Sequence, residues 1–163
     1  MIFRPYRPED FEALYGIEVL CFKPPLRFGR WYMRDLLQRR NSAAWIAEEG
    51  GRVAGFAIVE WTEAETGLAA YVQTIEVAPE ARSRGIGRAL LARVEGSALH
   101  AGADPIWLHV DEQNSVAQRL YKTQGYSARD RVEDYYAQGR AALVYSKSLA
   151  QVRGRKREGG ETR

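Results

Sequence analysis

The sequence predicts a single α/β domain in which a mixed central sheet of about seven strands carries helices on both faces. Short apolar segments alternate with segments of helical spacing along most of the chain, which is the pattern of a layered α/β fold. The 163 residues suffice for one domain with its own core. Hydrophobic residues make up 45% and charged residues 28%, and this ordinary composition excludes disorder of the whole chain.

The first half of the chain predicts a strand, two helices and an antiparallel meander of three strands. Proline and two acidic residues at positions 8–10 are typical of a helix start, and Lys23-Pro24-Pro25 ends that helix. Glycines at 50 and 51 mark a hairpin turn. The expected elements are a strand over Ile2–Pro5, a helix over 8–21, a helix over about 29–40, and strands over 43–47, 53–61 and 68–78.

The second half predicts two further helices and three strands. The helix after residue 85 has apolar residues on one face, and Asn114 followed by Gly125 is typical of the start and end of a helix over 115–124. The nearly continuous apolar run at 106–110 predicts a buried parallel strand. A sixth strand begins at Tyr126 and a seventh covers 141–145. The expected order is therefore β-α-α-β-β-β-α-β-α-β-β over a domain of residues 1–150.

The net charge of +3 comes from the C-terminal residues, since residues 152–163 hold five basic and two acidic side chains. Residues 151–163 therefore predict a basic, disordered tail, either simply solvated or in weak contact with an acidic partner such as RNA. No other nucleic-acid contact is expected. One cysteine and two histidines make a poor ligand set, so no metal is expected, and Cys21 has no partner for a disulfide within the chain. No apolar run approaches the ~20 residues that span a membrane, and no signal peptide is visible, so we expect a cytoplasmic protein.

The loop at 82–87 is the most informative stretch of the chain. Gly85 and Gly87 lack a Cβ, so a ligand can approach their backbone, and the following helix start offers free N–H groups to a phosphate or pyrophosphate. Arg82, Arg84 and Arg88 add positive charge. Neither the P-loop pattern nor the dinucleotide fingerprint fits these residues. A tight strand-to-helix turn without a ligand is the alternative interpretation.

Together with this loop, three further stretches resemble the GNAT superfamily of N-acetyltransferases. Arg-x-x-Gly-x-Gly at 82–87 is similar to the acetyl-CoA pyrophosphate loop of that superfamily, and residues 71–77, 108–114 and 120–126 follow its pattern in the expected order. Within the superfamily, the chain is most similar to enzymes that acetylate protein N-termini, including ribosomal-protein-alanine acetyltransferases. Asp134-Tyr135-Tyr136 stands where those enzymes have Asn-Tyr-Tyr.

The resemblance implies how acetyl-CoA binds. The family parts the strands at 68–78 and 106–110, and the cofactor enters between them. The backbone of Ile75 and Val77, beside Glu76, is then expected to pair with the pantetheine arm, and Asn114 and Tyr121 to contact the cofactor. The pyrophosphate would be held by the loop residues Arg82, Ser83, Arg84, Gly85, Ile86, Gly87 and Arg88.

Acetyl transfer needs a group that takes a proton from the amine and one that protonates the departing thiolate. His109 is the first candidate base, because an imidazole accepts protons near neutral pH, and Tyr71 is its expected partner. The bacterial ribosomal-protein enzymes carry Glu in that slot, whereas some eukaryotic N-terminal acetyltransferases have Leu-His-Val with a tyrosine matching Tyr71. A structural histidine is the alternative. Tyr121 is the expected acid, with helix packing as the alternative, and Glu76, acting through water, is the alternative base or else a surface charge.

The acceptor is expected to be the N-terminal α-amine of a protein or peptide, for example of a ribosomal protein, acetylated directly without an acetyl-enzyme. A small-molecule amine is the alternative acceptor, and a non-catalytic acyl-CoA sensor the alternative function. A monomer and a homodimer are both compatible with the sequence. The alternative is that Trp31 and Tyr32 lie partly in the core. The candidate acceptor-binding residues are the aromatic and proline side chains Phe22, Pro25, Tyr32, Tyr135 and Tyr136.

Overall fold

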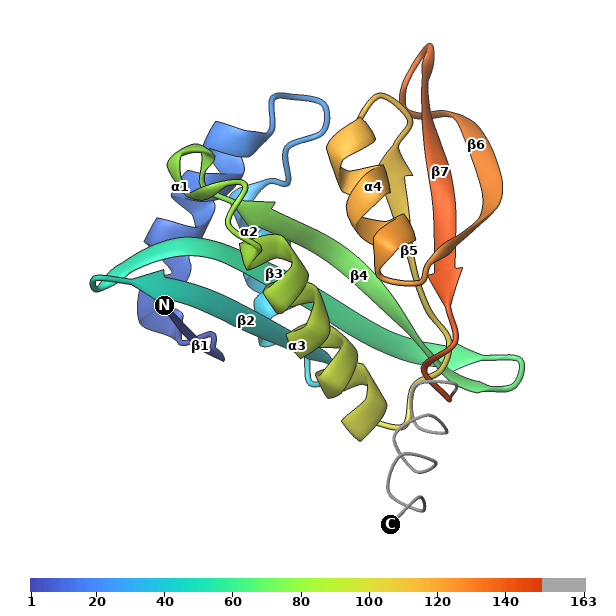
Figure 1. Ribbon diagram of the computed structural model, residues 1–163, viewed down its shortest axis with the longest axis horizontal. Helices are drawn as coiled ribbons and strands as arrows, with labels where there is room; N and C mark the ends of the chain where they lie inside the picture. Colours follow the sequence, from blue (N-terminus) through green and yellow to red (C-terminus); the bar gives the residue numbers. More distant parts are fainter. Residues whose placement is uncertain (151–163) are drawn as a thin grey trace.

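The computed structural model describes residues 1–150, and the predicted tail at 151–163 lies outside the described residues (Figure 1). Among these residues, no helix is long and apolar enough to cross a membrane. The elements in chain order are β1 (Ile2–Pro5), the 3-10 turn η1 (Pro8–Asp10), α1 (Phe11–Cys21), α2 (Arg30–Gln38), β2 (Ser42–Glu49), β3 (Arg52–Ala64), β4 (Gly67–Val77), the 3-10 turn η2 (Pro79–Ala81), α3 (Ile86–His100), β5 (Ile106–Asp111), α4 (Ser115–Thr123), β6 (Ser127–Ala137) and β7 (Arg140–Lys147).

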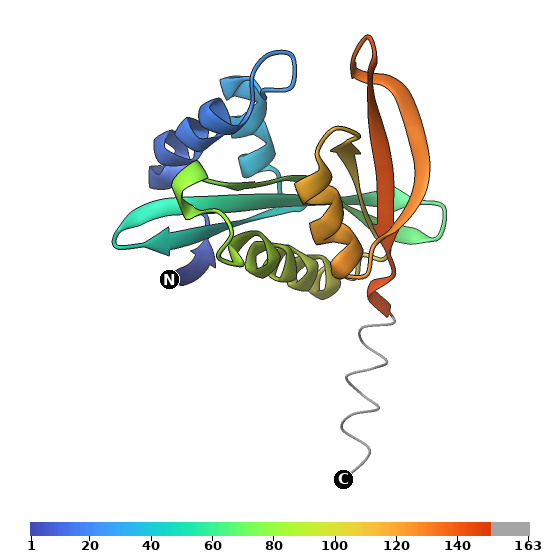
Figure 2. The same cartoon turned by 45° about the horizontal axis from the view of Figure 1, so that its top comes forward.

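Seven strands form one mixed sheet in the order β1-β2-β3-β4-β5-β7-β6, which confirms the expected architecture. The meander of β2, β3 and β4 is antiparallel throughout, as predicted. Helices α1 and α2 lie on one face of the sheet and α3 on the other, and the hairpin of β6 and β7 rises at one end (Figure 2). The sheet therefore has a helical layer on each side of its central strands.

Expected and observed element bounds differ by a few residues, for example in the second helix. The sequence predicts it over about 29–40, but α2 covers Arg30–Gln38 with Gly29 as its extended N-cap. The prediction of a buried parallel strand holds for β5 only in part. This strand is parallel to β4 over only two residue pairs and antiparallel to β7 along its whole length. An apolar run indicates that a strand is buried, but it does not indicate whether the neighbouring strands are parallel or antiparallel to it.

The β1 strand is tied to the start of α1 by a half-buried ion pair. The Arg4 guanidinium donates two hydrogen bonds to the Asp10 carboxylate, each 2.8 Å long. The backbone N–H of Arg7 donates to the same carboxylate at 2.8 Å. The hydrogen bond from Arg4 holds the pKa of Asp10 below its ordinary value. The edge of the sheet and the first helix are thus fixed to one another.

The close approach of β3 to β4 depends on Gly55. A Cβ at this position would lie 2.7 Å from the backbone oxygen of Glu76, closer than real Cβ contacts. Glycine is therefore needed in β3 opposite the C-terminal half of β4.

The sheet opens between β4 and β5. The two strands pair only at Ala70 with Ile106 and at Tyr71 with Trp107. Beyond Tyr71 they separate, so residues 72–77 of β4 have no partner strand on that side. This separation, expected from the family resemblance, exposes backbone donors and acceptors of β4.

Candidate active site

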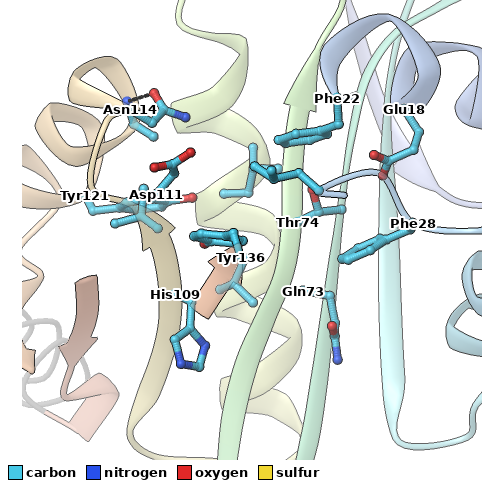
Figure 3. A pocket seen from close by; sticks show the side chains of 15 residues that line it. Glu18, Phe22, Phe28, Gln73, Thr74, His109, Asp111, Asn114, Tyr121 and Tyr136 are labelled. Atoms are coloured by element: carbon cyan, nitrogen blue, oxygen red, sulfur yellow. Dashed lines mark hydrogen bonds between the residues drawn. The ribbon is translucent and has the colours of Figure 1, made fainter. Parts of the chain in front are cut away.

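A cleft lies where β4 and β5 separate, and α4 and the segment between α1 and α2 complete its walls (Figure 3). It brings together residues more than 100 positions apart in the sequence. The lining residues are Glu18, Phe22, Leu26, Phe28, Val72, Gln73, Thr74, Ile75, His109, Val110, Asp111, Asn114, Ala117, Tyr121 and Tyr136.

His109 projects from β5 into this cleft and is held by two tyrosines. The Tyr71 hydroxyl lies 2.8 Å from Nδ1 of His109. The Tyr135 ring stacks on the imidazole, with ring centroids 4.2 Å apart and planes 14° from parallel. Burial lowers the pKa of His109. The imidazole is therefore oriented, half-buried and neutral at physiological pH, with Nε2 remaining for a further hydrogen bond.

Tyr121 reaches the same cleft from α4, two helical turns after Asn114. Its side chain is 7% exposed, and burial raises the pKa of its phenol. The phenol therefore keeps its proton and can donate it or a hydrogen bond. The Asn114 oxygen accepts the Ala117 N–H at 3.1 Å, so its amide NH₂ remains to contact a ligand.

Glu76 lies on β4 but is turned toward α1. It is 3% exposed, and its Oε2 accepts a 2.7 Å hydrogen bond from Thr74. Its carboxyl group faces that of Glu18 on α1. Burial, reinforced by the Glu18 charge, raises the pKa of Glu76 to about 9. Glu76 is therefore neither a surface charge nor an ionised base at neutral pH.

The loop before α3 has the backbone conformation of an anion site. Ser83 and Gly85 have φ values of +64° and +79°, and Gly85 precedes α3 without a side-chain cap, leaving the first N–H groups of the helix available. A Cβ on Gly85 would meet no protein atom within 4 Å, so the space beside it is open to a ligand. The Ile86 side chain is buried in the core, and Gly87 packs near Leu120.

The arginines of this loop differ in their partners. Arg82 donates to the Val77 carbonyl at 3.1 Å, which fixes the loop against the end of β4. Arg84 forms a bidentate ion pair with Glu49, at 2.6 and 2.7 Å. Among residues 1–150, Arg88 forms no ion pair. Arg88 is therefore the loop cation best able to approach a ligand anion.

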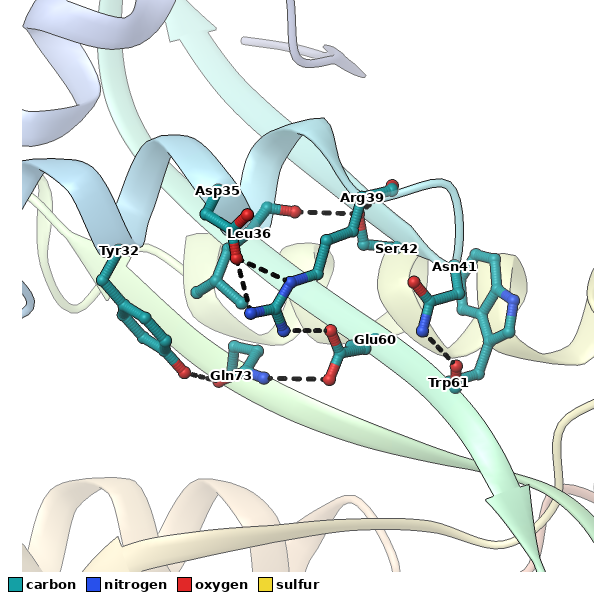
Figure 4. Close-up of polar contacts among 9 residues, drawn as sticks. All are labelled: Tyr32, Asp35, Leu36, Arg39, Asn41, Ser42, Glu60, Trp61 and Gln73. Carbon is teal, nitrogen blue, oxygen red and sulfur yellow. Dashed lines mark hydrogen bonds and ion pairs between the residues drawn. The ribbon is translucent and has the colours of Figure 1, made fainter.

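A β-bulge at Gln73 interrupts the pairing of β4 with β3, because Ile58 pairs with Thr74 and Val59 with Val72. The extra residue of a bulge is left out of the ladder. The Gln73 side chain is held by polar contacts of 3.5 Å to Tyr32 and to Glu60, and Glu60 is paired with Arg39 (Figure 4). This network connects α2 to the cleft.

The candidate acceptor-binding residues occupy different places. Phe22 and Tyr136 line the cleft, while Tyr135 covers His109 and the Tyr32 hydroxyl contacts Gln73. Pro25 is exposed and does not line the cleft. The alternative that Trp31 and Tyr32 lie partly in the core is wrong for Trp31, which is 87% exposed, and Tyr32 is itself 42% exposed.

Sequence reasoning gave no role to four polar residues that line the cleft, namely Glu18, Gln73, Thr74 and Asp111. Glu18 follows Leu14 by one helical turn on the apolar face of α1, and an acid at a core position was the available signal. Asp111 ends the apolar strand β5, where it accepts a 2.8 Å hydrogen bond from Arg140. No local pattern marks Gln73, because the bulge places its side chain.

Comparison with known proteins agrees with this geometry. Residues 11–126 match the family described as Acetyltransferase (GNAT) family. A mycothiol acetyltransferase of Thermobispora bispora is 33% identical over 138 residues, which cover 76% of this chain and 45% of that protein. The chain spans about half the length of the curated relatives it matches.

Solved structures share the fold. Arabidopsis thaliana NAA60 in complex with acetyl-CoA superposes with a TM-score of 0.81 at 23% identity, covering 91% of this chain and 98% of that one. The ribosomal-protein-S18-alanine N-acetyltransferase of Escherichia coli superposes with a TM-score of 0.78 at 22% identity, covering 91% and 93%.

Proposed function

The chain belongs to the GNAT acetyltransferase family, and from the chemistry of its cleft we propose that it transfers the acetyl group of acetyl-CoA directly to the N-terminal α-amine of a protein or peptide. The observation that carries the proposal is the His109–Tyr71 contact on the wall of the cleft between β4 and β5. A proton acceptor at this place can take the proton of an amine that enters the cleft beside acetyl-CoA bound along β4.

The residues present fit acetyl-CoA. Its pantetheine arm contains amides, which the unpaired edge of β4 at Ile75 and Val77 can hold in the manner of an added strand. The open backbone around Gly85 and the start of α3 suit the pyrophosphate, with Arg88 as a nearby cation. When bound, acetyl-CoA supplies the acetyl group as a reactive thioester.

His109 is the proposed proton acceptor. In the tautomer whose Nδ1–H donates to the Tyr71 oxygen, Nε2 is free to take the proton of the attacking amine. Its lowered pKa keeps the ring neutral at physiological pH. Glu76 is a poorer base for two reasons. Its raised pKa keeps its carboxyl group protonated at neutral pH, and this group is directed toward α1 and not into the cleft.

Tyr121 and the bulge at Gln73 complete the proposed machinery. The Tyr121 phenol retains its proton and lies on the α4 side of the cleft, where it can protonate the departing thiolate. The backbone N–H of the bulged residue Gln73 is the proposed hydrogen-bond donor to the acetyl carbonyl oxygen. Asn114 would contact the cofactor through its free amide NH₂.

A peptide acceptor is supported by the aromatic rim of the cleft, where Phe22, Tyr135 and Tyr136 offer stacking surfaces and phenols. Similarity to the NAA60 and S18-alanine acetyltransferase structures supports it further.

A small amine is the second candidate, because the relative from T. bispora is named mycothiol acetyltransferase and is not named for a protein substrate. We place the protein in the cytoplasm and assign the activity to residues 1–150, without the tail.

The decisive experiment measures thiol release from acetyl-CoA with peptides of varied first residue and with small amines, and locates the acetyl group by mass spectrometry. We expect acetylation confined to peptide α-amines. Turnover with small amines alone would replace the acceptor, and CoA binding without any turnover would favour the acyl-CoA sensor.

His109→Ala provides the matched test of the chemistry. We expect CoA binding to persist while turnover falls by about 10²-fold or more, because general base catalysis contributes about 10²–10⁴-fold. A chain ending at residue 150 should retain full turnover, and loss of activity on that truncation would assign a role to the tail.

A further inference from the structure

Two glutamates with unsatisfied carboxyl groups lie together beside the cleft. Glu18 on α1 is 1% exposed and Glu76 on β4 is 3% exposed. Both Glu18 oxygens and Oε1 of Glu76 have no hydrogen-bond partner among residues 1–150. Of the four oxygens, Oε2 of Glu76 alone is satisfied there, by Thr74.

The neighbouring arginines form hydrogen bonds with groups other than these two glutamates. Arg27 donates to the backbone oxygens of Phe22 and Val19, at 2.9 and 3.2 Å. Arg82 donates to the Val77 carbonyl at 3.1 Å and lies 3.4 Å from the sulfur of Cys21. Within the described part of the chain, neither glutamate takes part in an ion pair.

Such an arrangement is costly for the free protein. Buried polar groups are almost always hydrogen-bonded, and a buried carboxylate needs a charged or hydrogen-bonding partner. A proton kept by one carboxyl group lowers the charge and can form one hydrogen bond between the two groups, but it leaves other oxygens of the pair without a partner. These remaining unsatisfied oxygens therefore indicate a partner that arrives from outside the chain.

The surroundings define the chemistry of that partner. Glu18 lines the cleft, and Figure 3 shows its carboxyl group between Phe22 and Phe28, directed toward Thr74. Aromatic faces attract cations, and carboxylates form strong hydrogen bonds with ammonium groups. Phe22, Phe28 and Leu26 also offer an apolar wall to an aliphatic stem. An ammonium group on an unbranched alkyl chain matches all of these features.

We propose that Glu18 and Glu76 form a subsite for a second ammonium group of the acceptor, distinct from the amine that receives the acetyl group. The acceptor is then a lysine-bearing peptide N-terminus or, in the small-molecule case, a diamine. This inference rests on the proposed function, because it assigns the acceptor of the same cleft. The incoming ammonium group donates hydrogen bonds to the unsatisfied oxygens and balances the charge of an ionised carboxyl group in the pair.

The test compares acceptors that differ only in the distal ammonium group. The pairs are peptides with lysine or norleucine at the first or second position, and 1,5-diaminopentane against hexylamine. For the wild-type protein we expect kcat/KM to be about tenfold or more higher for the member with the second ammonium, equivalent to about 1.4 kcal/mol. Equal kcat/KM within both pairs would overturn the proposal.

Glu18→Gln should bring this ratio close to one, because it removes the charge and keeps the shape. Any loss caused by a disturbed α1 affects both members of a pair and cancels in the ratio. Glu63→Gln is the matched control, since it removes one exposed carboxylate of β3 and should leave the ratio unchanged. A ratio that survives both Glu18→Gln and Glu76→Gln would refute the subsite.

A binding measurement separates this inference from the proposed function. 1,5-Diaminopentane should raise the melting temperature of the wild-type protein more than hexylamine does, and Glu18→Gln should abolish the difference. Complete absence of acetylation would defeat the proposed function, whereas this shift would still support the subsite. Identical shifts with the two amines would contradict it.

Discussion

Tyr71 and His109 stand 38 positions apart in the sequence and meet where β4 and β5 still pair, just before the strands separate. The pairing of Tyr71 with Trp107 sets the distance, and the hydroxyl contact then sets the orientation of the imidazole. The Tyr135 ring removes one face of the histidine from water. Residues from three elements, β4, β5 and β6, thereby orient the imidazole for the proposed proton transfer.

The lowered pKa of His109 predicts the pH profile. A base acts when it is neutral, so kcat/KM should rise with pH through a value below the ordinary 6.5 of histidine and be constant above pH 7. Steady-state kinetics between pH 5 and 9 measures this. An acidic limb centred above pH 7.5 would contradict His109 as the base, and loss of the limb in His109→Ala would support it.

Glu76 predicts a pH-dependent stability. Its pKa is raised from 4.5 to about 9 on folding, so between these values the folded state retains a proton that the unfolded state has lost. Stability therefore falls as pH rises through this window. Glu76→Gln should equal the wild type near pH 4 and exceed it by about 1–3 kcal/mol at pH 8, measured by urea denaturation. A constant difference across this range would contradict the raised pKa.

These residues illustrate what local sequence reports. The family pattern marks both His109 and Tyr71 as candidates, but their contact requires strand pairing that no single segment encodes. The sequence leaves Glu76 open between a base and a surface charge, since alternation along β4 does not say which face α1 covers. Its partner Glu18 becomes visible only once α1 is packed on the sheet.

The loop and helix at 82–100 show how an element can make a site from backbone alone. Gly85 holds a positive φ, Ser83 does the same beside it, and α3 starts without a side-chain cap. The glycine pattern correctly predicts the turn and the helix that follows it, because both depend on residues close in the sequence. The bulge at Gln73 has no such signal, because bulges depend on the register of two strands.

Gly85→Ala should weaken CoA binding about tenfold, because the added methyl enters the open space beside the helix start, and the positive φ should cost about 1–2 kcal/mol of stability. Gly96→Ala in the same helix is the control. A Cβ on Gly96 would meet no atom within 4 Å and its φ is not positive, so alanine should add about 0.5–1 kcal/mol of stability without changing affinity. Calorimetric titration and thermal denaturation measure both effects. Equal CoA affinity for both variants would contradict the loop as the pyrophosphate site.

The molecule consists of two parts of one sheet that touch at few points. Strands β1 to β4 form one part and β5, β7 and β6 the other, joined by only two residue pairs between β4 and β5. A ligand along the open edge of β4 contacts both parts. We therefore expect bound acetyl-CoA to pair with the open edge of β4 as an added strand between β4 and β5.

Hydrogen exchange should show this effect. With CoA at about 100 times its dissociation constant, the protein should gain about 2.7 kcal/mol of stability. Under conditions of local opening, backbone amides of residues 72–77 and of the start of α3 should exchange more slowly, while amides between β2 and β3 should not change. Uniform protection of all strands, or none at 72–77, would contradict this binding mode.

Composition, periodicity and turn chemistry were sufficient for the α/β class, the number and order of strands and the loop at 82–87, because those properties follow from neighbours along the chain. The family pattern supplied His109, Tyr71 and Tyr121 as candidates. Folding was needed to pair β5 with β7, to expose Trp31 and to bury Glu18 against Glu76. These features depend on contacts between distant segments, whose energies no local window of the sequence contains.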